Sequence, residues 1–485
     1  MDKRFLENAW GNWPFSMYKT AYLSTQAILE NAVGMANIHS TVKKKAELDV
    51  VLRSVLSILT PTSYPLTNPD VLNDTIKSGG MNIYRGLSNM MDDANRSILN
   101  LPPAGSENFK VGTNVAITPG RVIFKNHLIE VIQYIPVKEI VHAEPILIVP
   151  AWIMKYYILD LEPKNSMIKW LLEQGHQVFV ISWKNPTAED KNLTMESYRR
   201  AGVMAAIDVV SREIPNQKIH AVGYCLGGTM LAIAAATMAR DGDQRLGSIT
   251  LLAAQTDFSE AGEIRAFLDD KQVSLIETLM NGVGYLDGKQ MGMSFQLMRP
   301  DELIWSKMIR EYALGKRDKM NSMSAWNADT TRMPAKMHSE YLHSLYIENQ
   351  LAKGKYEVAG KNIKLGSIKV PMFIVGASSD NVAPWQSVFK VVNLCKDTTF
   401  CLASGGHNQG IVTHPSSGKG SHQIGRVDHP LATPDDFLHH AVEQKGSWWT
   451  SWNIWLKNIN SHEMVKPNYP FPGDPKAPGE YVFER

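Results

Sequence analysis

A cysteine stands at the centre of the segment Gly223-Tyr-Cys-Leu-Gly227, between an apolar run and a long apolar stretch. A nucleophile on a sharp turn between a strand and a helix needs small residues two positions before and after it, because larger side chains would clash there. The N-terminus of a helix also favours a thiolate and an oxyanion through its N–H groups and its dipole. The pattern predicts that Cys225 is a nucleophile. The alternative is a buried structural cysteine, since free cysteines are common in protein cores.

Two further residues of suitable chemistry follow Cys225 in the chain. Asp380 ends the segment 371–380, which begins as an apolar strand, and His407 ends the segment 398–407, the next strand followed by a glycine-rich loop. The order nucleophile, acid, histidine is that of the α/β-hydrolase fold. A lone histidine on a loop is more often a solvated surface residue, but this one has the position that such a relay requires. The sequence therefore predicts a triad of Cys225, Asp380 and His407.

Segments of strand length alternate with helical segments through most of the chain. The expected strands are 122–134, 146–149, 178–183, 219–224, 249–254, 372–375 and 399–402. Helical patterns lie between them, for example at 166–174 and 194–212. This alternation predicts an α/β protein with a doubly wound, mostly parallel sheet of the α/β-hydrolase type.

The domain organisation follows from the remaining patterns. Residues 1–120 are expected to form a mainly helical N-terminal domain, because apolar residues from 15 to about 60 recur with helical spacing. Residues 121–485 would form the catalytic domain. The chain between Cys225 and Asp380 is far longer than one helix, one strand and another helix require, so we expect a helical cap at about 258–367. Its methionines, among them Met280, Met291, Met293 and Met298, suit either ordinary core or a mobile lid.

Charge and cysteine content exclude several classes of protein. The 485 residues carry a formal net charge of +2 and no basic cluster beyond Lys43-Lys44-Lys45, which argues against a nucleic-acid partner. The three cysteines have neither a disulfide framework nor metal-ligand spacing, which predicts a cytoplasmic setting, no metal, and inert core positions for Cys395 and Cys401. No apolar run reaches the roughly 18 to 20 residues that span a bilayer, and the N-terminus lacks the apolar region of a signal peptide. A soluble protein without a membrane span is expected.

Two groups of side chains near the C-terminus have simpler interpretations than a binding site. Five histidines are expected in a polar loop and the helix after it, without the acidic partners of a metal site: His414, His422, His429, His439 and His440. The tryptophans of the segment 448–455 have helical spacing, and we expect them to pack a C-terminal helix on the sheet.

The chain resembles the polyhydroxyalkanoate synthases, most closely the single-subunit type that favours short hydroxyacyl units. The resemblance covers about residue 64 to the C-terminus and rests on these segments: Asn68-Pro-Asp70 with Gly79-Gly80, Val111–Gly120, Lys155–Leu161, Phe179–Trp183 with Asn185-Pro186, Gly223–Thr229, Trp326–Asp329 and Gly446–Trp449. The stretch ahead of the match is shorter than in typical members of this type.

The resemblance implies an acyltransferase that polymerises (R)-3-hydroxyacyl-coenzyme A, with 3-hydroxybutyryl-coenzyme A as the expected substrate. The acyl group would pass through Cys225, with Asp380 and His407 completing the triad. A cysteine suits this chemistry because exchange of one thioester for another keeps the acyl group activated. By analogy with the fold, the oxyanion donors would be the backbone N–H groups of Leu226 and of the turn near Trp152.

The implied partners are coenzyme A thioesters, the growing polyester chain and a second copy of the protein. The family resemblance places the activity in the cytoplasm at the surface of a polymer granule. No cofactor is expected, because the coenzyme A thioester is itself the substrate.

The sequence also departs from the family pattern. Met154 stands where the family commonly has Asn, Asn381 where it has His, and Asn408-Gln409-Gly410 where small or apolar residues precede the glycine. Two other interpretations therefore stay open: a cysteine hydrolase of the same fold that cleaves an ester or thioester, and an inactive granule-associated homologue. A hydrolase would consume thioester without making polymer, and an inactive homologue would have an unreactive Cys225.

Overall fold

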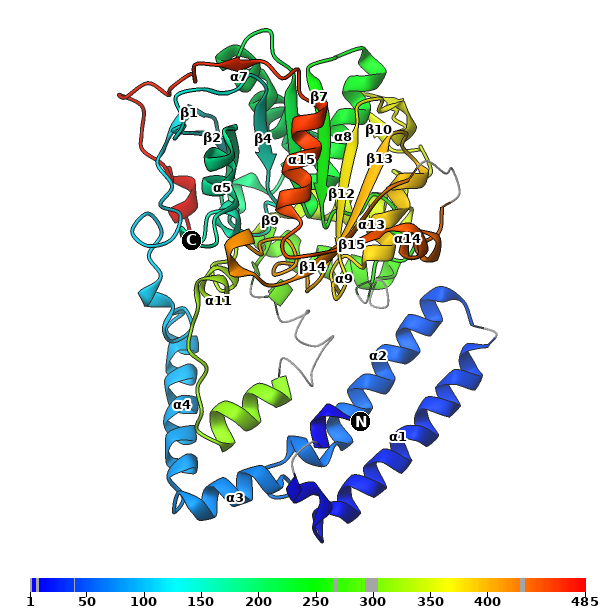
Figure 1. Cartoon of the computed structure of the whole chain (residues 1–485). Helices are drawn as coiled ribbons and strands as arrows, with labels where there is room; N and C mark the ends of the chain where they lie inside the picture. Colours follow the sequence, from blue (N-terminus) through cyan, green and yellow to red (C-terminus); the bar gives the residue numbers. More distant parts are fainter. Residues whose placement is uncertain are drawn as a thin grey trace. The chain divides into compact units, whose positions relative to one another are not determined.

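The protein is seen here in a computed structural model (Figure 1) that describes residues 2–5, 8–38, 40–262, 264, 268–288, 290–292, 304–427 and 432–485. Its internal contacts divide the chain into two compact units. The first unit comprises Met1–Asn108, Glu263–Phe267 and Lys289–Ala328, and the second comprises Phe109–Gly262, Leu268–Gly288 and Asp329–Arg485. The domain limits expected from the sequence, including the cap, remain predictions. Met293 and Met298 of the expected cap and His429 lie outside the described residues.

The N-terminal part of the first unit is helical, as the apolar spacing predicts. Its helices are α1 (Phe15–Asn37), α2 (Val42–Leu59), α3 (Pro69–Lys77) and α4 (Met81–Ile98). Asn68 caps α3 by accepting a hydrogen bond from the Asp70 N–H at 3.0 Å. Gly80 has φ = 85° between α3 and α4, a conformation that costs glycine no steric strain. Short polar caps and one glycine thus separate successive helices.

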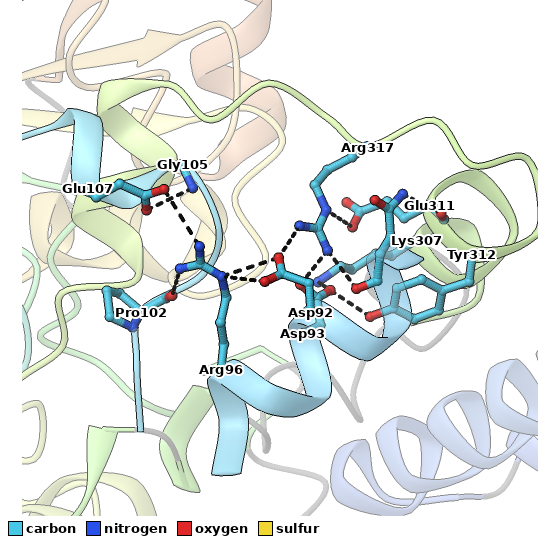
Figure 2. A network of polar contacts seen from close by, with 11 residues as sticks. Asp92, Asp93, Arg96, Pro102, Gly105, Glu107, Lys307, Glu311, Tyr312 and Arg317 are labelled. Carbon is cyan, nitrogen blue, oxygen red and sulfur yellow. Dashed lines mark hydrogen bonds and ion pairs between the residues drawn. The ribbon is translucent and has the colours of Figure 1, made fainter. Parts of the chain in front are cut away.

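A polar network joins α4 to a segment more than 200 residues later in the chain (Figure 2). Arg317 donates to the carboxylates of Asp92 and Asp93, each at 2.6 Å, and the Tyr312 hydroxyl donates to Asp93 at 2.7 Å. Tyr312 belongs to η10 (Met308–Ala313), a π-helix of the same unit.

The two backbones of this pair of helices approach closely beside the network. A Cβ atom at Gly86 would lie 1.8 Å from the carbonyl oxygen of Tyr312, so only glycine fits there. The buried amide of Asn82 donates to the Ala313 carbonyl at 2.9 Å. The first unit is therefore built from the N-terminal helices together with part of the expected cap.

The second unit holds a sheet of ten strands in the order β1-β2-β5-β4-β6-β7-β12-β13-β14-β15. The strands are β1 (Gly120–Lys125), β2 (Ile129–Tyr134), β4 (Pro145–Val149), β5 (Gln177–Trp183), β6 (Ile219–Tyr224), β7 (Leu246–Leu252), β12 (Met372–Ala377), β13 (Thr398–Ala403), β14 (Ser421–Val427) and β15 (Val442–Lys445). The six strands from β5 to β13 are parallel, and both outer pairs are antiparallel. The predicted α/β-hydrolase sheet is confirmed.

The expected strand 122–134 is in fact a hairpin of β1 and β2. Asn126 turns the chain, because its side-chain oxygen accepts from the N–H groups of Leu128 and Ile129 at 2.8 and 2.9 Å. The expectation that His422 lies in a polar loop is also wrong. His422 is a buried residue of β14, where its imidazole bonds to the Ser451 hydroxyl at 2.8 Å. Because polar residues stand on both sides of His422, the segment lacks the hydrophobic pattern that predicts a strand.

Helices cover both faces of the sheet. Figure 1 shows α5 (Met167–Gln174) and α15 (Trp449–Ile459) in front of it and α7 (Ala205–Glu213) and α8 (Leu226–Asp241) behind it. Trp448, Trp449 and Trp452 are fully buried, which confirms that these tryptophans pack the C-terminal helix.

Other elements of the second unit contribute short helices and strands beside the sheet. They are β3 (Val141–His142), η5 (Tyr156–Leu159), α6 (Met195–Ser197), η7 (Tyr198–Met204), α9 (Asp270–Val283), β8 (Tyr285–Leu286), β9 (Met333–Pro334), α12 (Ala335–Tyr341), η11 (Leu342–Ile347), α13 (Trp385–Phe389), α14 (Pro434–His440) and η15 (Tyr481–Phe483). In the described part of the chain, no helix is both long and apolar enough to cross a membrane.

A group of histidines lies at the amino ends of the parallel strands, and two of them, His176 and His220, are buried. The rings of His142 and His176 stack with centroids 4.8 Å apart. His176 bonds through Nε2 to the Asn453 amide oxygen at 2.8 Å, and His220 bonds through Nδ1 to the Ser248 hydroxyl at 2.7 Å. In the described part of the chain, the second ring nitrogen of His176 is buried without a hydrogen-bond partner.

Candidate active site

Cys225 occupies the turn between β6 and α8, with φ = 52° and ψ = −124°, a backbone conformation that is strained for any residue but glycine. A Cβ at Gly223 would lie 2.3 Å from the Cα of Gly228, and a Cβ at Gly227 would lie 2.2 Å from the carbonyl oxygen of Val149. Gly223 therefore lets the end of β6 approach the first turn of α8, and Gly227 lets that turn approach β4. Strand, strained turn and buried helix are all present, as the local sequence predicts.

The other two cysteines are unsuited to nucleophilic chemistry. Burial raises the pKa of the Cys395 thiol to about 12 and that of the Cys401 thiol still further. Both side chains are buried, while Cys225 is partly exposed. The predicted core positions of Cys395 and Cys401 are confirmed.

Asp380 and His407 lie in the loops after the neighbouring strands β12 and β13. Asp380 Oδ2 and His407 Nδ1 are 2.7 Å apart, and the carboxylate is fully buried. Asp380 Oδ1 accepts from the N–H groups of Val382 and Ala383 at 2.8 and 2.9 Å. These bonds fix the carboxylate, which in turn orients the imidazole so that Nε2 is free to face a nucleophile.

His407 also interacts with the Cys225 thiol. Burial of the imidazole favours its neutral form, but the charges of Cys225 and Asp380 and hydrogen bonds to both side chains outweigh this and raise the pKa of His407 to about 10. The surroundings of His407 therefore favour its charged form, which is the form it has after taking the proton of Cys225. The structure brings the three predicted residues together in one site.

The two expected oxyanion donors lie at the first turn of α8 and directly after β4. Within the described part of the chain, the backbone N–H groups of Leu226 and Trp152 have no hydrogen-bond partner. The Trp152 ring is buried against Tyr198 and Trp183, with centroids 4.9 and 5.8 Å away. Packing of the indole against these two rings therefore fixes the side chain of Trp152, whose backbone N–H is an expected oxyanion donor.

The loop after His407 is held by residues that the sequence did not identify. The Tyr224 hydroxyl donates to the Asn408 amide oxygen at 2.5 Å, and the Tyr224 ring stacks on His407 with centroids 5.7 Å apart. The indoles of Trp448 and Trp449 donate to the carbonyls of Gly410 and Ile411 at 3.0 and 2.8 Å. Asn408, a departure from the family pattern, therefore has a partner in the residue directly before the nucleophile.

Two tyrosines near the thiol were also missed. The pKa values of Tyr341 and Tyr346 are raised by burial and, to a smaller extent, by the charge of Cys225. Their rings are 5.4 Å apart, and Phe258 lies 4.8 Å from Tyr346. Tyr341 directly precedes the π-helix η11, and Tyr346 lies within it five positions later, so a search for a period of 3.6 residues does not reveal their common face.

The described residues contain no group of three or more His, Cys, Asp or Glu side chains arranged to hold a metal ion. Of the other departures, Asn381 is exposed and its amide donates to the Ser379 carbonyl at 3.3 Å. Met154 pairs with Thr330 in an isolated antiparallel bridge.

Comparison with known proteins extends this description to the whole chain. The family model for the N-terminus of poly-beta-hydroxybutyrate polymerase (PhaC) matches residues 1–171, and the model for the alpha/beta hydrolase fold matches residues 144–412. A poly(3-hydroxyalkanoate) polymerase of Methylorubrum extorquens is 38% identical over 490 residues, covering 99% of this chain and 80% of that protein. The chain belongs to the poly(3-hydroxyalkanoate) polymerase family.

Other members of the family show the same extent of similarity. A poly(3-hydroxyalkanoate) polymerase subunit PhaC of Rhizobium meliloti is 36% identical and covers 100% of this chain and 80% of its own length. The subunit of the same name from Cupriavidus necator is 34% identical, with 99% and 83% of the two chains covered. The family predicted from the sequence motifs is confirmed.

Proposed function

We propose that this chain polymerises (R)-3-hydroxyacyl-coenzyme A, in the simplest case 3-hydroxybutyryl-coenzyme A, into polyhydroxyalkanoate with release of coenzyme A. The observation that carries the proposal is the contact of His407 with both Asp380 and Cys225 on the hydrolase sheet. It supplies a nucleophile, a base and an orienting acid in a chain of the polymerase family.

The first half-reaction transfers the acyl group to the enzyme. His407 takes the proton of Cys225, and the sulfur attacks the thioester carbonyl carbon. The N–H groups of Leu226 and Trp152 stabilise the oxyanion; one such donor contributes about 100- to 1,000-fold to the rate. The bond from carbon to the coenzyme A sulfur then breaks, and His407 gives its proton to the departing thiolate.

Release of coenzyme A leaves His407 neutral and able to act as a base again. In the second half-reaction it accepts the proton of a 3-hydroxyl group, whose oxygen attacks the acyl group on Cys225. An ester bond forms, the carbon–sulfur bond breaks and the proton returns to the Cys225 sulfur. Base catalysis of this kind contributes roughly 100- to 10,000-fold. Asp380 keeps His407 oriented throughout and stabilises its charged form.

The surroundings of the thiol suit a reaction that must exclude water. Tyr341 and Tyr346 are buried near Cys225, and the buried ring of Phe258 packs against both. Exclusion of water matters because hydrolysis of the acyl-cysteine would end the chain. The reaction needs no cofactor. A homodimer at the surface of a polymer granule in the cytoplasm is part of the proposal and rests on the family resemblance.

The two rival interpretations are less well supported. A cysteine hydrolase of the same fold is not favoured, because the relatives that match the whole chain are named polymerases. An inactive homologue is disfavoured by the contacts among Cys225, His407 and Asp380, which leave no member of the relay displaced.

The test is to follow coenzyme A release from (R)-3-hydroxybutyryl-coenzyme A together with turbidity, with Cys225→Ala as the control. We expect release accompanied by turbidity in the parent and neither in the variant. Release without turbidity would favour the hydrolase. No release, together with an unreactive Cys225 thiol, would favour the inactive homologue.

A further inference from the structure

Lys155 is a buried cation three positions after Trp152. Only 4% of its side chain is exposed, and its ammonium group lies 2.9 Å from Asp329 Oδ1 and donates to the Val482 carbonyl at 2.6 Å. The Tyr157 hydroxyl donates to the other carboxylate oxygen of Asp329 at 2.9 Å. Burial lowers the pKa of Lys155 even though the charge of Asp329 raises it. A buried charge needs such partners, since an unpaired one is very costly.

Asp329 begins a short segment, 329–332, that runs antiparallel to residues 152–155. Thr330 pairs with Met154, and the Thr331 N–H donates to the Ile153 carbonyl at 3.4 Å. The buried hydroxyl of Thr331 donates to the carbonyl of Trp152 at 2.6 Å. The ion pair and this hydrogen bond therefore fasten both ends of the turn after β4 to the same segment.

A second contact secures the far end of that segment. The N–H of Arg332 donates to the side-chain oxygen of Asn185 at 2.9 Å, and the N–H of Asn185 donates to Glu484 at 2.8 Å. The loop after β5 and the C-terminal tail thus support the segment that holds the turn.

The stability of the fold does not by itself explain a buried ion pair. Replacing both partners of such a pair by neutral side chains of similar size is often neutral for stability, because the cost of desolvating two charges offsets their attraction. A fixed geometry is what the pair supplies. An oxyanion hole requires a fixed geometry, because its donors act only when they lie within a few tenths of an ångström of the correct position.

We propose that the Lys155–Asp329 ion pair is a positioning element that, through Thr331, holds the Trp152 turn in the geometry required for oxyanion binding. Neither member of the pair touches the reacting atoms. The inference rests on the proposed function, because it assigns the second oxyanion donor of that same site to the Trp152 turn.

The test separates acylation of Cys225 from the reactivity of its thiol. Acylation is measured as the burst of p-nitrophenol from p-nitrophenyl butyrate, in which the acyl group moves to the Cys225 sulfur and p-nitrophenolate leaves. Thiol reactivity is measured as the rate of alkylation by iodoacetamide, a reaction without an oxyanion. The burst does not require polymerisation, so a normal parent burst without polymer would refute the proposed function and leave this inference testable.

The main variant is Lys155→Met with Asp329→Asn, which keeps an acceptor for the Tyr157 hydroxyl. We expect its burst to be about 10- to 100-fold slower, part of the effect of losing one oxyanion donor, with alkylation within about 2-fold of the parent. The matched control is Lys184→Met with Asp190→Asn, a pair of the same type and the same 2.9 Å length, which should change neither rate.

Thr331→Val tests the same link without touching the ion pair, should the double variant fail to fold. It removes the Thr331 hydroxyl, which donates to the Trp152 carbonyl, and we expect a burst about 10-fold slower with unchanged alkylation. The proposal is overturned if the folded variants have the parent burst rate, or if alkylation slows in parallel with the burst.

Discussion

The two ends of the parallel strands hold histidines whose pKa values are shifted in opposite directions. At the carboxyl edge, the pKa of His407 is raised to about 10, while at the amino edge burial lowers the pKa of His176 to about 3. Both imidazoles are extensively buried and both are hydrogen-bonded. They differ in the partner, because His407 bonds to the Asp380 carboxylate and His176 to the neutral amide of Asn453.

This contrast shows that burial alone does not decide whether a histidine can act as a catalytic base. Desolvation disfavours the imidazolium at both edges, and only a bonded anion reverses the outcome. Glu144 is the carboxylate that acts on the amino edge, where its charge raises the pKa of His142 and His220 by less than burial lowers it. The raised pKa of His407 therefore depends on two charged neighbours, Cys225 and the Asp380 carboxylate at hydrogen-bond distance.

The largest expected effect comes from giving His407 the kind of partner that His176 has. Asp380→Asn replaces the carboxylate by an amide, which should lower the pKa of His407 and leave the thiol without its charged neighbour at neutral pH. We expect coenzyme A release to fall roughly 100- to 10,000-fold. Coenzyme A release is measured for the parent and the variant. Iodoacetamide alkylation from pH 5 to 10 follows the reactivity of the thiol, with Asn381→Asp as a control at the adjacent exposed position. Unchanged alkylation at pH 7 would contradict the assignment of Asp380.

A smaller effect concerns the loss of folding stability in acid that His176, at the amino ends of the parallel strands, should cause. The pKa of His176 is lower in the folded protein than its ordinary value of 6.5, so the unfolded chain binds more protons between about pH 3 and 6.5. Stability must then rise with pH in this window and be lost as pH falls through it. For His176 the loss at pH 5 is about 2 kcal/mol relative to pH 7.

The measurement is urea unfolding at pH 5 and pH 7 for the parent and for His176→Gln. The variant should show a difference between the two pH values that is about 2 kcal/mol smaller than the parent's. Asn453→Asp, which gives His176 a carboxylate partner, should also reduce the difference. An identical pH dependence in all three proteins would mean that folding does not lower the pKa of His176.

The smallest effect tests how the loop after His407 is held. Tyr224→Phe removes the hydroxyl that bonds to Asn408 and keeps the ring that stacks on His407. The loss of one hydrogen bond of about 1 kcal/mol corresponds to about a 5-fold slower coenzyme A release. Asn408→Ala should have a similar effect, and the double variant should be no slower than either single one. Additive losses would show that the two side chains act separately.

The sequence was most informative where the chemistry is local. Gly223 and Gly227 flank Cys225 within five positions, so the requirements of the turn can be read directly. The pairing of Lys155 with Asp329 could not be inferred, because it joins distant segments through tertiary packing even though both residues stand in family motifs. β14 was missed for a related reason: its buried residue is a histidine, whose partners come from β15 and α15 rather than from its neighbours in sequence.

The first unit combines α4 with a segment made much later in synthesis. The bond between Asn82 and Ala313 spans 231 positions. At a translation rate of about 5 to 20 residues per second, α4 emerges from the ribosome roughly 10 to 50 s before its partner exists. Gly86 and the acidic pair Asp92 and Asp93 are thus a docking surface that must stay open during that interval. The nascent N-terminal helices therefore lack these contacts for that interval, and the chain of this unit is complete only once Ala328 has been made, before the last segment of the second unit, Asp329–Arg485.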